Sequence, residues 1–405
     1  YIKSFPTEKV SPNTKKLIDM IEQVDAVINC AGITKPHSLK DPPTTLFING
    51  LFPNILSAIY KDKLITKFMG LKIGNLISKK EISSKDLENK KIAIDSSQMI
   101  YQFISSIRQP DGTPLMDSNQ NITSHLQGII TRVTNLMAQN IKLCFVFDGK
   151  APLLKIKEQE EREYRKQLAE KKFEQAKEEH DEELMLRYSK QSIRLKKEMI
   201  EESKELIQDL GLPVIQAPSE AEAQAAFMNE RGDVDLVGSS DYDTLLYGAP
   251  KLIRNLTVSQ RRKIASGAYV NVSPEVIELK EVLNNLNINQ DQLIILAILV
   301  GTDYNEGVPR VGPKTALRLV KQYKNFDELF SQVKADFNWK EIYAVFKNMP
   351  IIKNYKLKWT KPEVEKIMKL LVDKHEFNQE RVQKNIDRII NFKKNTEQNN
   401  LTKFF

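Results

Sequence analysis

The sequence predicts an α/β fold in which a central mixed, mostly parallel sheet is accompanied by exposed helices and followed by a helical region. Three observations predict it. From Met69 onward, short apolar runs alternate with helical patterns, which is typical of βαβ units. Acidic side chains stand at the ends of several of these runs. The segment 153–206 is crowded with charge and contains neither Gly nor Pro.

The composition limits the kind of protein. At 405 residues the chain is long enough for two or three domains with a substantial core. Its two cysteines, Cys30 and Cys144, lie in apolar runs and make neither a disulfide framework nor a zinc site. No apolar run reaches 18 residues and no signal peptide is found, so we expect an intracellular protein that is neither secreted nor membrane-bound. The net charge of +8 favours a polyanionic partner.

Residues 1–68 differ in character from the rest. The runs VDAVINCAGITKP (24–36) and FINGLFPNILSAIY (47–60) resemble a middle piece of a short-chain dehydrogenase or sugar-nucleotide reductase. The piece lacks the G-x-G-x-x-G turn that holds a dinucleotide, so we expect no NAD binding. A fragment of a sheet cannot bury its faces, so we do not expect it to fold independently. We expect Met69 to be the true start and the preceding residues to be a gene-model or assembly artefact.

Seven acidic side chains stand at the ends of apolar runs with the pattern of buried strands or helices. The runs are KIAID (91–95), KLCFVFDG (142–149), VIQAPSEAEA (214–223), DLVGSSDYD (235–243) and LIILAILVGTD (293–303), and the acids are Asp95, Asp148, Glu220, Glu222, Asp241, Asp243 and Asp303. Ligands bind at the carboxyl ends of parallel strands, so we expect these groups to share one edge of the sheet. A buried carboxylate is costly unless it is paired or binds metal.

Some of these acids also have a simpler interpretation. A lone Asp after a strand is often a helix N-cap, and Asp303 can be a turn residue. Ser219 with Glu222 matches a capping box, which leaves Glu220 without a role. Asp241 and Asp243 are more informative. In an extended segment residues i and i+2 point the same way, and two like charges so close need a cation between them.

Taken together, the acids predict metal-dependent phosphoryl chemistry. Oxygen ligands alone indicate Mg²⁺ or Mn²⁺. Two such ions about 4 Å apart can activate a water and stabilise the leaving oxygen of a phosphodiester displacement. No Ser/His/Asp set competes, because none of the four histidines lies near these elements. The basic charge suggests nucleic acid as the ester.

The segment 153–206 predicts long exposed helices that project from the body. Its apolar residues are too sparse to bury a continuous face. A solvated charged hairpin without a role is the alternative.

The segment GVPRVGPKT (307–315) resembles a Walker A loop with one inserted residue, Pro313. Because proline also removes a backbone N–H, we exclude ATP binding. We expect Gly312 to cap a new helix that begins at Pro313, with free N–H groups that bind a DNA phosphate. A helix-turn-helix with only a packing role is the alternative. The residues that follow at helical spacing as a basic stripe are Lys314, Arg318 and Lys321.

From Met69 to Phe405 the chain resembles the flap endonuclease family of structure-specific 5′ nucleases. The motifs that carry the resemblance, in the family's order, are AIDSSQMIYQFI (93–104), FVFDGKAP (145–152), APSEAEAQAA (217–226), SSDYDTLLYG (239–248), LVGTDYNEGVPRVGPKTA (299–316) and QNNLTKFF (398–405). The resemblance implies a Mg-dependent 5′ flap endonuclease of Okazaki fragment maturation and base excision repair, with weaker 5′–3′ exonuclease activity. A 5′–3′ exonuclease or gap endonuclease is a second enzymatic interpretation.

The resemblance also implies a PIN-like 5′-nuclease fold and a domain organisation. The expected parts are a nuclease domain 69–289 (an N-terminal part 69–152, a helical arch 153–206 and an internal part 207–289), a helical DNA-binding region 290–390 and a flexible tail 391–405.

The family's functional residues match positions in this sequence. The resemblance implies that all seven carboxylates ligate two Mg²⁺ ions, for which Mn²⁺ can substitute, and that the helical hairpin holds a K⁺ ion. Tyr101 matches an aromatic residue that stacks on a base, and its alternative role is core packing. Lys155 and Arg162 match a basic pair that reaches the scissile phosphate. The residues expected at the DNA are Arg108, Arg132, Glu220, Gly301, Asp303, Gly312, Lys314 and Arg318.

The end of the chain is similar to a sliding-clamp-binding box, Q-x-x-L-x-x-F-F, formed by Gln398, Leu401, Phe404 and Phe405. One helical turn puts Leu401 and the aromatic residues on one side, as a plug for a hydrophobic pocket. We therefore expect a monomer of archaeal type that binds DNA with a 5′ flap and the sliding clamp (PCNA), in the cytoplasm at the nucleoid. A non-catalytic clamp-binding DNA scaffold is the alternative.

Overall fold

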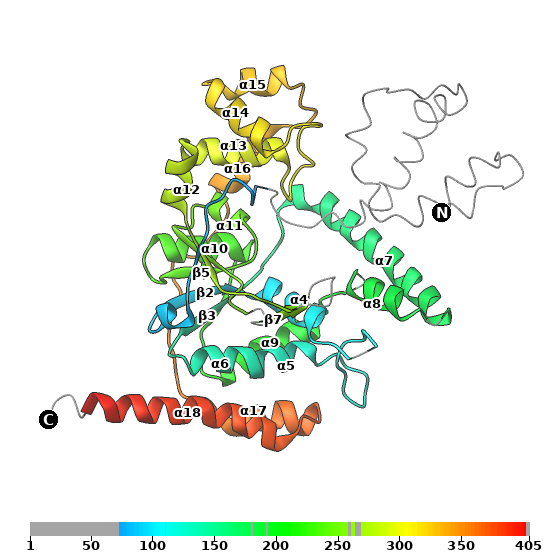
Figure 1. Ribbon diagram of the computed structural model, residues 1–405, viewed down its shortest axis with the longest axis vertical. Helices are drawn as coiled ribbons and strands as arrows, with labels where there is room; N and C mark the ends of the chain where they lie inside the picture. The colour runs from blue at the N-terminus through cyan, green and yellow to red at the C-terminus, as the bar shows by residue number, and fades with distance from the viewer. Residues whose placement is uncertain are drawn as a thin grey trace, which may run out of the picture. The chain divides into compact units, whose positions relative to one another are not determined.

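The computed structural model describes residues 73–109, 111–179, 181–191, 193–257, 261–263 and 269–401. The chain divides into two units, Tyr1–Phe68 and Met69–Phe405, at the position where the sequence changes character. The reductase-like runs in the first unit lie outside the described residues. Figure 1 shows how the elements of the second unit are arranged.

The elements begin and end as follows. The strands are β1 (Lys80–Glu81), β2 (Lys91–Asp95), β3 (Lys142–Phe147), β4 (Val214–Gln216), β5 (Leu236–Gly238), β6 (Lys251–Arg254), β7 (Arg261–Lys263), β8 (Tyr269–Asn271) and β9 (Glu275–Glu278). The helices are α4 (Ser96–Ser106), α5 (Ser124–Gly128), α6 (Thr134–Met137), α7 (Ile156–Glu178), α8 (Glu182–Gln191), α9 (Lys197–Asp209), α10 (Ala221–Glu230), α11 (Asp243–Leu246), α12 (Leu279–Leu286), α13 (Gln290–Val300), α14 (Pro313–Gln322), α15 (Phe326–Gln332), α16 (Trp339–Lys347), α17 (Val364–Met368) and α18 (Gln379–Leu401). Short 3₁₀ turns cover Ser84–Leu87 and Leu153–Lys155, and π-helical turns cover Ile129–Val133 and Lys369–Lys374.

Within the described residues, the central sheet has seven strands in the order β1-β9-β6-β5-β2-β3-β4. The strands β4, β3, β2, β5 and β6 run parallel, whereas β9 pairs antiparallel with β6 and β1. The short strands β7 and β8 form a separate antiparallel pair. The prediction of a mixed, mostly parallel sheet in an α/β fold is confirmed.

Both faces of the sheet are covered by helices, which explains why its strands are almost continuously apolar. Successive strand residues point to opposite faces. Ile92 and Ile94 of β2 therefore join one core with α4, α5 and α9, whereas Ala93 and Cys144 join a second core with the alanine-rich helix α10. A third core surrounds α13, whose residues 293–299 are all buried by the neighbouring helices of the region α12 to α16.

The helices α7 and α8 pack against each other and extend away from the sheet (Figure 1). This arrangement agrees with the predicted exposed helices. The predicted boundary at residue 206 is corrected, because α9 belongs to the body. Its residues Met199, Leu206 and Ile207 are buried in the core. Their spacing of seven and eight residues gives α9 the amphipathic face that α7 lacks.

After α16 the chain returns across the body of the protein. Trp359 Nε1 donates to Leu143 O of β3 at 2.7 Å, and Gln224 of α10 exchanges two hydrogen bonds with the backbone of Ile352. The helices α17 and α18 then pack against α9 and α6. The helix α18 extends to Leu401, within the segment 391–405, and the flexibility expected of that tail stays a prediction.

The crossing of this returning segment over Gly211 gives a stability prediction. Gly211 has φ +79°, and a Cβ there would lie 2.5 Å from Thr360 O. Gly211→Ala is expected to lower the free energy of unfolding by about 3 kcal/mol. Two costs add here: the strain of alanine in a left-handed conformation and the clash of its Cβ with Thr360 O. Gly232 is the control, since its φ is +75° but nothing lies within 4 Å of its Cβ. Urea denaturation should show a loss of only about 1 kcal/mol for Gly232→Ala, and equal losses for both would contradict the clash.

A buried cluster of histidines and carboxylates ties the C-terminal helices to the body. His375 Nδ1 lies 2.9 Å from Asp117 Oδ2, and His375 Nε2 lies 3.1 Å from Glu202 Oε1. Lys374 Nζ donates to the same Glu202 oxygen at 2.7 Å. The buried His125 approaches the other Glu202 oxygen at 3.7 Å. Residues from α5, α9 and the segment after α17 therefore meet at Glu202.

Acid is expected to weaken this cluster. Burial acts to raise the pKa of Glu202, but its neighbours His125, Lys374 and His375 outweigh burial and lower the pKa to about 2. A lowered carboxyl pKa stabilises the fold above the unfolded value, and this gain is lost as the pH falls toward the folded value. Between about pH 5 and pH 3, the wild-type chain should lose about 2 kcal/mol more than Glu202→Gln in urea denaturation. Equal losses would contradict the prediction.

Candidate active site

The seven predicted carboxylates lie where neighbouring elements end. The strands β2, β3, β4 and β5 are parallel, so the segments that follow them leave the sheet at the same edge. The seventh group follows α13. The positions are Asp95 at the end of β2, Asp148 directly after β3, Glu220 and Glu222 at the start of α10, Asp241 and Asp243 between β5 and α11, and Asp303 after α13.

The electrostatics show that these groups are close together. Burial, together with the charges of Asp148 and Asp241, raises the pKa of Asp95 to about 8. Burial, and then the charges of Asp241 and Asp95, raise the pKa of Glu222 well above its ordinary value. Burial and Asp241 do the same for the pKa of Asp243. Repulsion between neighbouring carboxylates destabilises this edge unless cations offset it.

The carboxylates fit hard divalent cations in their chemistry. Asp95 accepts a hydrogen bond from Gln98 N at 3.2 Å and Asp148 accepts one from Ala221 N at 2.7 Å, so part of their capacity is used by helix starts. Asp243 Oδ1 is buried without a hydrogen-bond partner. Among the described residues, no group of three or more such side chains is already arranged to hold one ion. The donor set, all oxygen and partly unpartnered, is nevertheless the kind that Mg²⁺ prefers.

Glu222 is not part of the predicted capping box. The helix α10 begins at Ala221 with Glu220 as its N-cap, and the Ser219 hydroxyl donates to Lys150 O at 2.8 Å instead. Glu222 Oε1 accepts from the Ser239 hydroxyl at 2.9 Å. Glu222 therefore faces the other carboxylates, and the capping alternative is corrected.

The segment that holds Asp241 and Asp243 is a turn and not an extended strand. Tyr242 has φ −81° and ψ −10°, and Asp243 is the first residue of α11. The predicted i, i+2 geometry is therefore wrong, although both groups still belong to the cluster. Tyr242 is itself buried, and its hydroxyl accepts from Arg254 Nη1 at 2.6 Å.

Two cations from the base of the α7–α8 arch meet this edge. Lys155 Nζ lies 2.7 Å from Glu220 Oε2 and 3.3 Å from Asp303 Oδ2. Arg162 Nη2 lies 3.0 Å from Asp303 Oδ2, and its Nε pairs with Glu158. Burial acts to lower the pKa of Lys155, but Glu220 and Asp303 raise it above its ordinary value. Both residues remain charged at neutral pH.

The other residues predicted near DNA have protein contacts. Tyr101 is partly buried against the core of α4; burial raises its pKa, and the nearby charges of Arg108 and Arg162 oppose that rise. The Arg108 guanidinium donates to Gly112 O, to Ser189 O and to the Ser189 hydroxyl, which links α4 to α8. Arg132, the second arginine expected at the DNA, lies on the π-helical turn Ile129–Val133, and its Nη1 donates to Thr257 O at 2.8 Å. Their roles at DNA stay predictions.

The hairpin between α13 and α14 has the predicted form. Gly312 is the N-cap of α14 and Pro313 is its first residue. Gly301 ends α13 with φ +113°. The stripe residues Lys314, Arg318 and Lys321 are all exposed.

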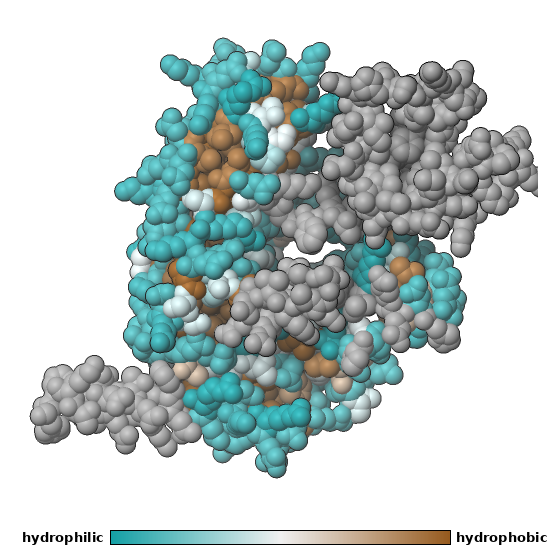
Figure 2. Space-filling model, viewed as in Figure 1, coloured by the Kyte–Doolittle hydropathy of each residue, from teal (hydrophilic) through white to brown (hydrophobic). Residues whose placement is uncertain are grey.

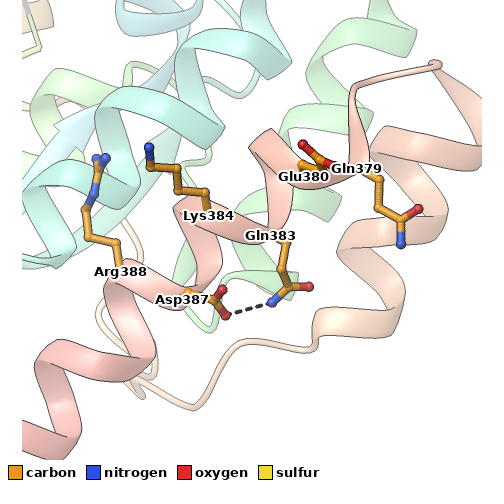
Figure 3. Close-up of a pocket in the computed structure, with 6 residues that line it drawn as sticks. All are labelled: Gln379, Glu380, Gln383, Lys384, Asp387 and Arg388. Carbon is orange, nitrogen blue, oxygen red and sulfur yellow. Dashed lines mark hydrogen bonds between the residues drawn. The ribbon is translucent and has the colours of Figure 1, made fainter.

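Of the predicted clamp-binding box, Phe404 and Phe405 lie outside the described residues, as do the side chains of Gln398 and Leu401. Earlier on the same helix, a surface hollow of ≈ 590 Å³ is lined by α18 alone (Figure 3). Its residues are polar and of mixed charge, and none belongs to the carboxylate cluster. Figure 2 shows the viewed face as largely hydrophilic, with its hydrophobic residues mostly over the upper, helical region. In the described part of the chain, no helix is long and apolar enough to cross a membrane.

Sequence reasoning missed several groups that contact the cluster. The hydroxyls of Tyr247 and Tyr304 lie 2.8 Å apart, and the charge of Glu220 adds to the rise that burial causes in both pKa values. The Thr244 hydroxyl donates to Glu222 Oε1 at 3.2 Å. Tyr304 and Thr244 each directly follow a predicted ligand in the sequence, which is a signal that could have marked them.

Two domain profiles match the chain. The XPG N-terminal domain matches residues 69–169, and the XPG I-region matches residues 211–303. These ranges contain all seven carboxylates, and also Lys155 and Arg162.

Relatives match over most of their length. The flap endonuclease 1 of Ignicoccus hospitalis is 46% identical over 333 residues, which cover 81% of this chain and 95% of the relative. The flap endonuclease 1 of Pyrococcus abyssi is 46% identical over 339 residues, which cover 83% of this chain and 98% of the relative.

Solved structures agree in fold. Flap endonuclease-1 from Methanococcus jannaschii matches with a TM-score of 0.64 and 40% identity, over 81% of this chain and 100% of that chain. The catalytic core of Rad2 in complex with DNA substrate matches with a TM-score of 0.57 and 22% identity, over 78% of this chain and 97% of that chain. The second likeness concerns the fold alone.

Proposed function

Because this chain belongs to the flap endonuclease family, we propose that it cuts a 5′ flap of DNA at its junction with the duplex, using two Mg²⁺ ions held by its seven carboxylates. The chain is a structure-specific flap endonuclease. One observation supports the mechanism most strongly: Glu220 and Asp303, two members of the carboxylate cluster, pair with Lys155 and Arg162 from the base of the arch.

The cluster divides into groups that would hold the ions in different ways. Asp243 has a buried oxygen without a partner, so it is suited to direct coordination. Asp148 has one oxygen engaged with Ala221 N, which leaves its other oxygen for an ion or a water. When bound, the ions polarise the phosphodiester and lower the pKa of the attacking water.

Lys155 and Arg162 have a second task in this scheme. In the free protein they neutralise Glu220 and Asp303. Divalent ions bound by these carboxylates would offset their charge and would leave both side chains available to the phosphate that is cut. There they stabilise the charge that develops on its oxygens. Tyr101, close to Arg162, would stack on the adjacent base.

The hairpin between α13 and α14 would bind the duplex part of the DNA. The exposed stripe Lys314, Arg318 and Lys321 lies on α14, whose N-terminus at Gly312 presents free N–H groups. The K⁺ ion expected in this hairpin would add a further positive charge.

The remaining assignments extend this scheme. We propose weaker 5′–3′ exonuclease activity at the same site, Mn²⁺ as a substitute ion, a monomeric protein, and work in Okazaki fragment maturation and base excision repair. The box 398–405 is proposed to bind the sliding clamp.

Metal use is tested by native mass spectrometry and cleavage assays on the full chain. We expect two Mn²⁺ per chain, and cutting of a 5′-flap DNA with Mg²⁺ or Mn²⁺ but not with EDTA. Cutting at the same rate in EDTA would contradict the proposal. For the clamp, deletion of residues 398–405 should abolish binding to immobilised clamp and leave cutting without clamp unchanged. Retained clamp binding would refute the box.

A further inference from the structure

The turn Ser239–Asp243 holds two of the seven carboxylates, yet it belongs to no helix or strand up to Tyr242. Asp241 N donates to the Ser239 hydroxyl at 3.1 Å, and Asp243 N donates to Asp241 Oδ1 at 3.3 Å. Asp241 and Asp243 share this edge with Asp95 and other carboxylates, and like charges so close repel one another. Something outside the turn must oppose that force.

One tether comes from α4. Gln98 Oε1 accepts from Ser240 N at 2.5 Å and from the Ser239 hydroxyl at 3.0 Å. The backbone N–H of the same residue donates to Asp95 Oδ1 at 3.2 Å. Gln98 therefore connects Asp95, the first of the seven carboxylates, to Ser240, 142 positions after Gln98, in the turn that holds Asp241.

The second tether comes from β6, on the other side of the turn. Arg254 Nε donates to Ser240 O at 3.0 Å, and its Nη1 donates to the Tyr242 hydroxyl at 2.6 Å. The guanidinium carbon lies 4.4 Å from the centre of the Tyr242 ring. Glu275 Oε2, 3.6 Å from Nη1, keeps the guanidinium in place. The backbone N–H and C=O of Ser240 are thus each held by a side chain, from two different elements.

We propose that Gln98 and Arg254 are positioning residues that hold the turn Ser239–Asp243 against carboxylate repulsion and thereby set the affinity of the site for divalent cations. This inference rests on the proposed function, because it assumes that the cluster binds cations. Neither residue is one of the seven carboxylates, so each would act through the turn that it holds. Side chains that orient metal ligands typically change metal affinity 10- to 100-fold when removed.

The chain offers matched controls for both residues. Gln102 lies one turn further along α4, and its Oε1 accepts from the Thr257 hydroxyl at 2.8 Å, away from the turn. Arg231 lies over the ring of Tyr355 at 5.8 Å and pairs with Asp233 at 3.2 Å, so like Arg254 it has one tyrosine ring and one carboxylate as partners, but away from the turn. The tests are Gln98→Leu against Gln102→Leu, and Arg254→Met against Arg231→Met.

The first readout is binding of Mn²⁺ to the full chain without DNA, measured by isothermal titration calorimetry. Gln98→Leu and Arg254→Met should bind about tenfold more weakly than wild type, and both controls should bind as wild type. The second readout is the single-turnover cutting rate against Mg²⁺ concentration. The half-maximal concentration should rise about tenfold for the two test variants, with recovery of most of the rate at saturation.

Wild-type affinity for Mn²⁺ in Gln98→Leu and Arg254→Met would overturn the inference, even if both variants unfold at lower temperature. That result would leave the two residues with a role in folding alone. If the wild-type chain itself bound no divalent cation, the proposed function would fail as well. The two failures are therefore distinguished by the wild-type titration.

Discussion

Replacing Asp243 by Asn is expected to lower flap cutting at least about 1000-fold and, in EDTA, to raise the stability of the protein. The first effect follows from loss of a carboxylate that is suited to direct coordination. The second follows because Asp243 is buried among like charges, with one oxygen unpartnered. We expect a gain of about 2 kcal/mol in the free energy of unfolding without metal.

In Mg²⁺ we expect the wild-type protein to be more stable than Asp243→Asn, which is the opposite of the order expected in EDTA. A ligand that binds only the folded state stabilises it by mass action, so wild type should gain with Mg²⁺ and Asp243→Asn should gain little. Thermal unfolding in EDTA and in Mg²⁺ measures the difference in stability between wild type and Asp243→Asn in each condition. The exposed Asp336→Asn is the control and should change neither activity nor stability. If Asp243→Asn cut at the wild-type rate, Asp243 would have no part in the site.

The second large effect is expected at the base of the arch. Arg162→Ala and Lys155→Ala should each lower the single-turnover cutting rate by about 100- to 1000-fold, because each removes a cation that stabilises charge in the transition state. Affinity for flap DNA should change by less than about fivefold, since one charge among many contacts is lost.

Arg165 provides the control on the same helix. Its Nε donates to Glu161 O and does not reach the carboxylates. Arg165→Ala should cut within about twofold of wild type. A rate loss for Arg165→Ala equal to that for Arg162→Ala would show that the cutting rate depends on the overall positive charge of α7 and not on the contact of Arg162 with Asp303. Rapid-quench kinetics with filter-binding measurements separate the rate from the affinity.

The carboxylates at the edge of the sheet could be predicted because each is marked by apolar residues shortly before it in the sequence. Asp95 is the last residue of β2 and Asp148 directly follows β3, and parallel strands bring such ends together. The start of α14 at Pro313 after Gly312 was likewise readable, because proline is favoured at the first helical position.

Other features depend on partners far along the chain, and pattern alone could not supply them. The Ser219 hydroxyl bonds Lys150 O, 69 positions away, so the expected capping box does not form. The helix α9 looked like a continuation of the charged arch, but its few apolar residues are placed on one face and bury against α5. The tethers Gln98 and Arg254 meet the turn at Ser240 only in the folded chain.

One measurement tests the central claim most directly. A 5′-labelled double-flap DNA is incubated with Mg²⁺ and either the full chain or a version that begins at Met69, with Asp241→Ala as the inactive control. Cutting at the flap junction by the version that begins at Met69, abolished in Asp241→Ala, is the predicted result. If neither folded protein cut the flap, or if Asp241→Ala cut it unchanged, the assignment of this carboxylate edge as the active site would be wrong.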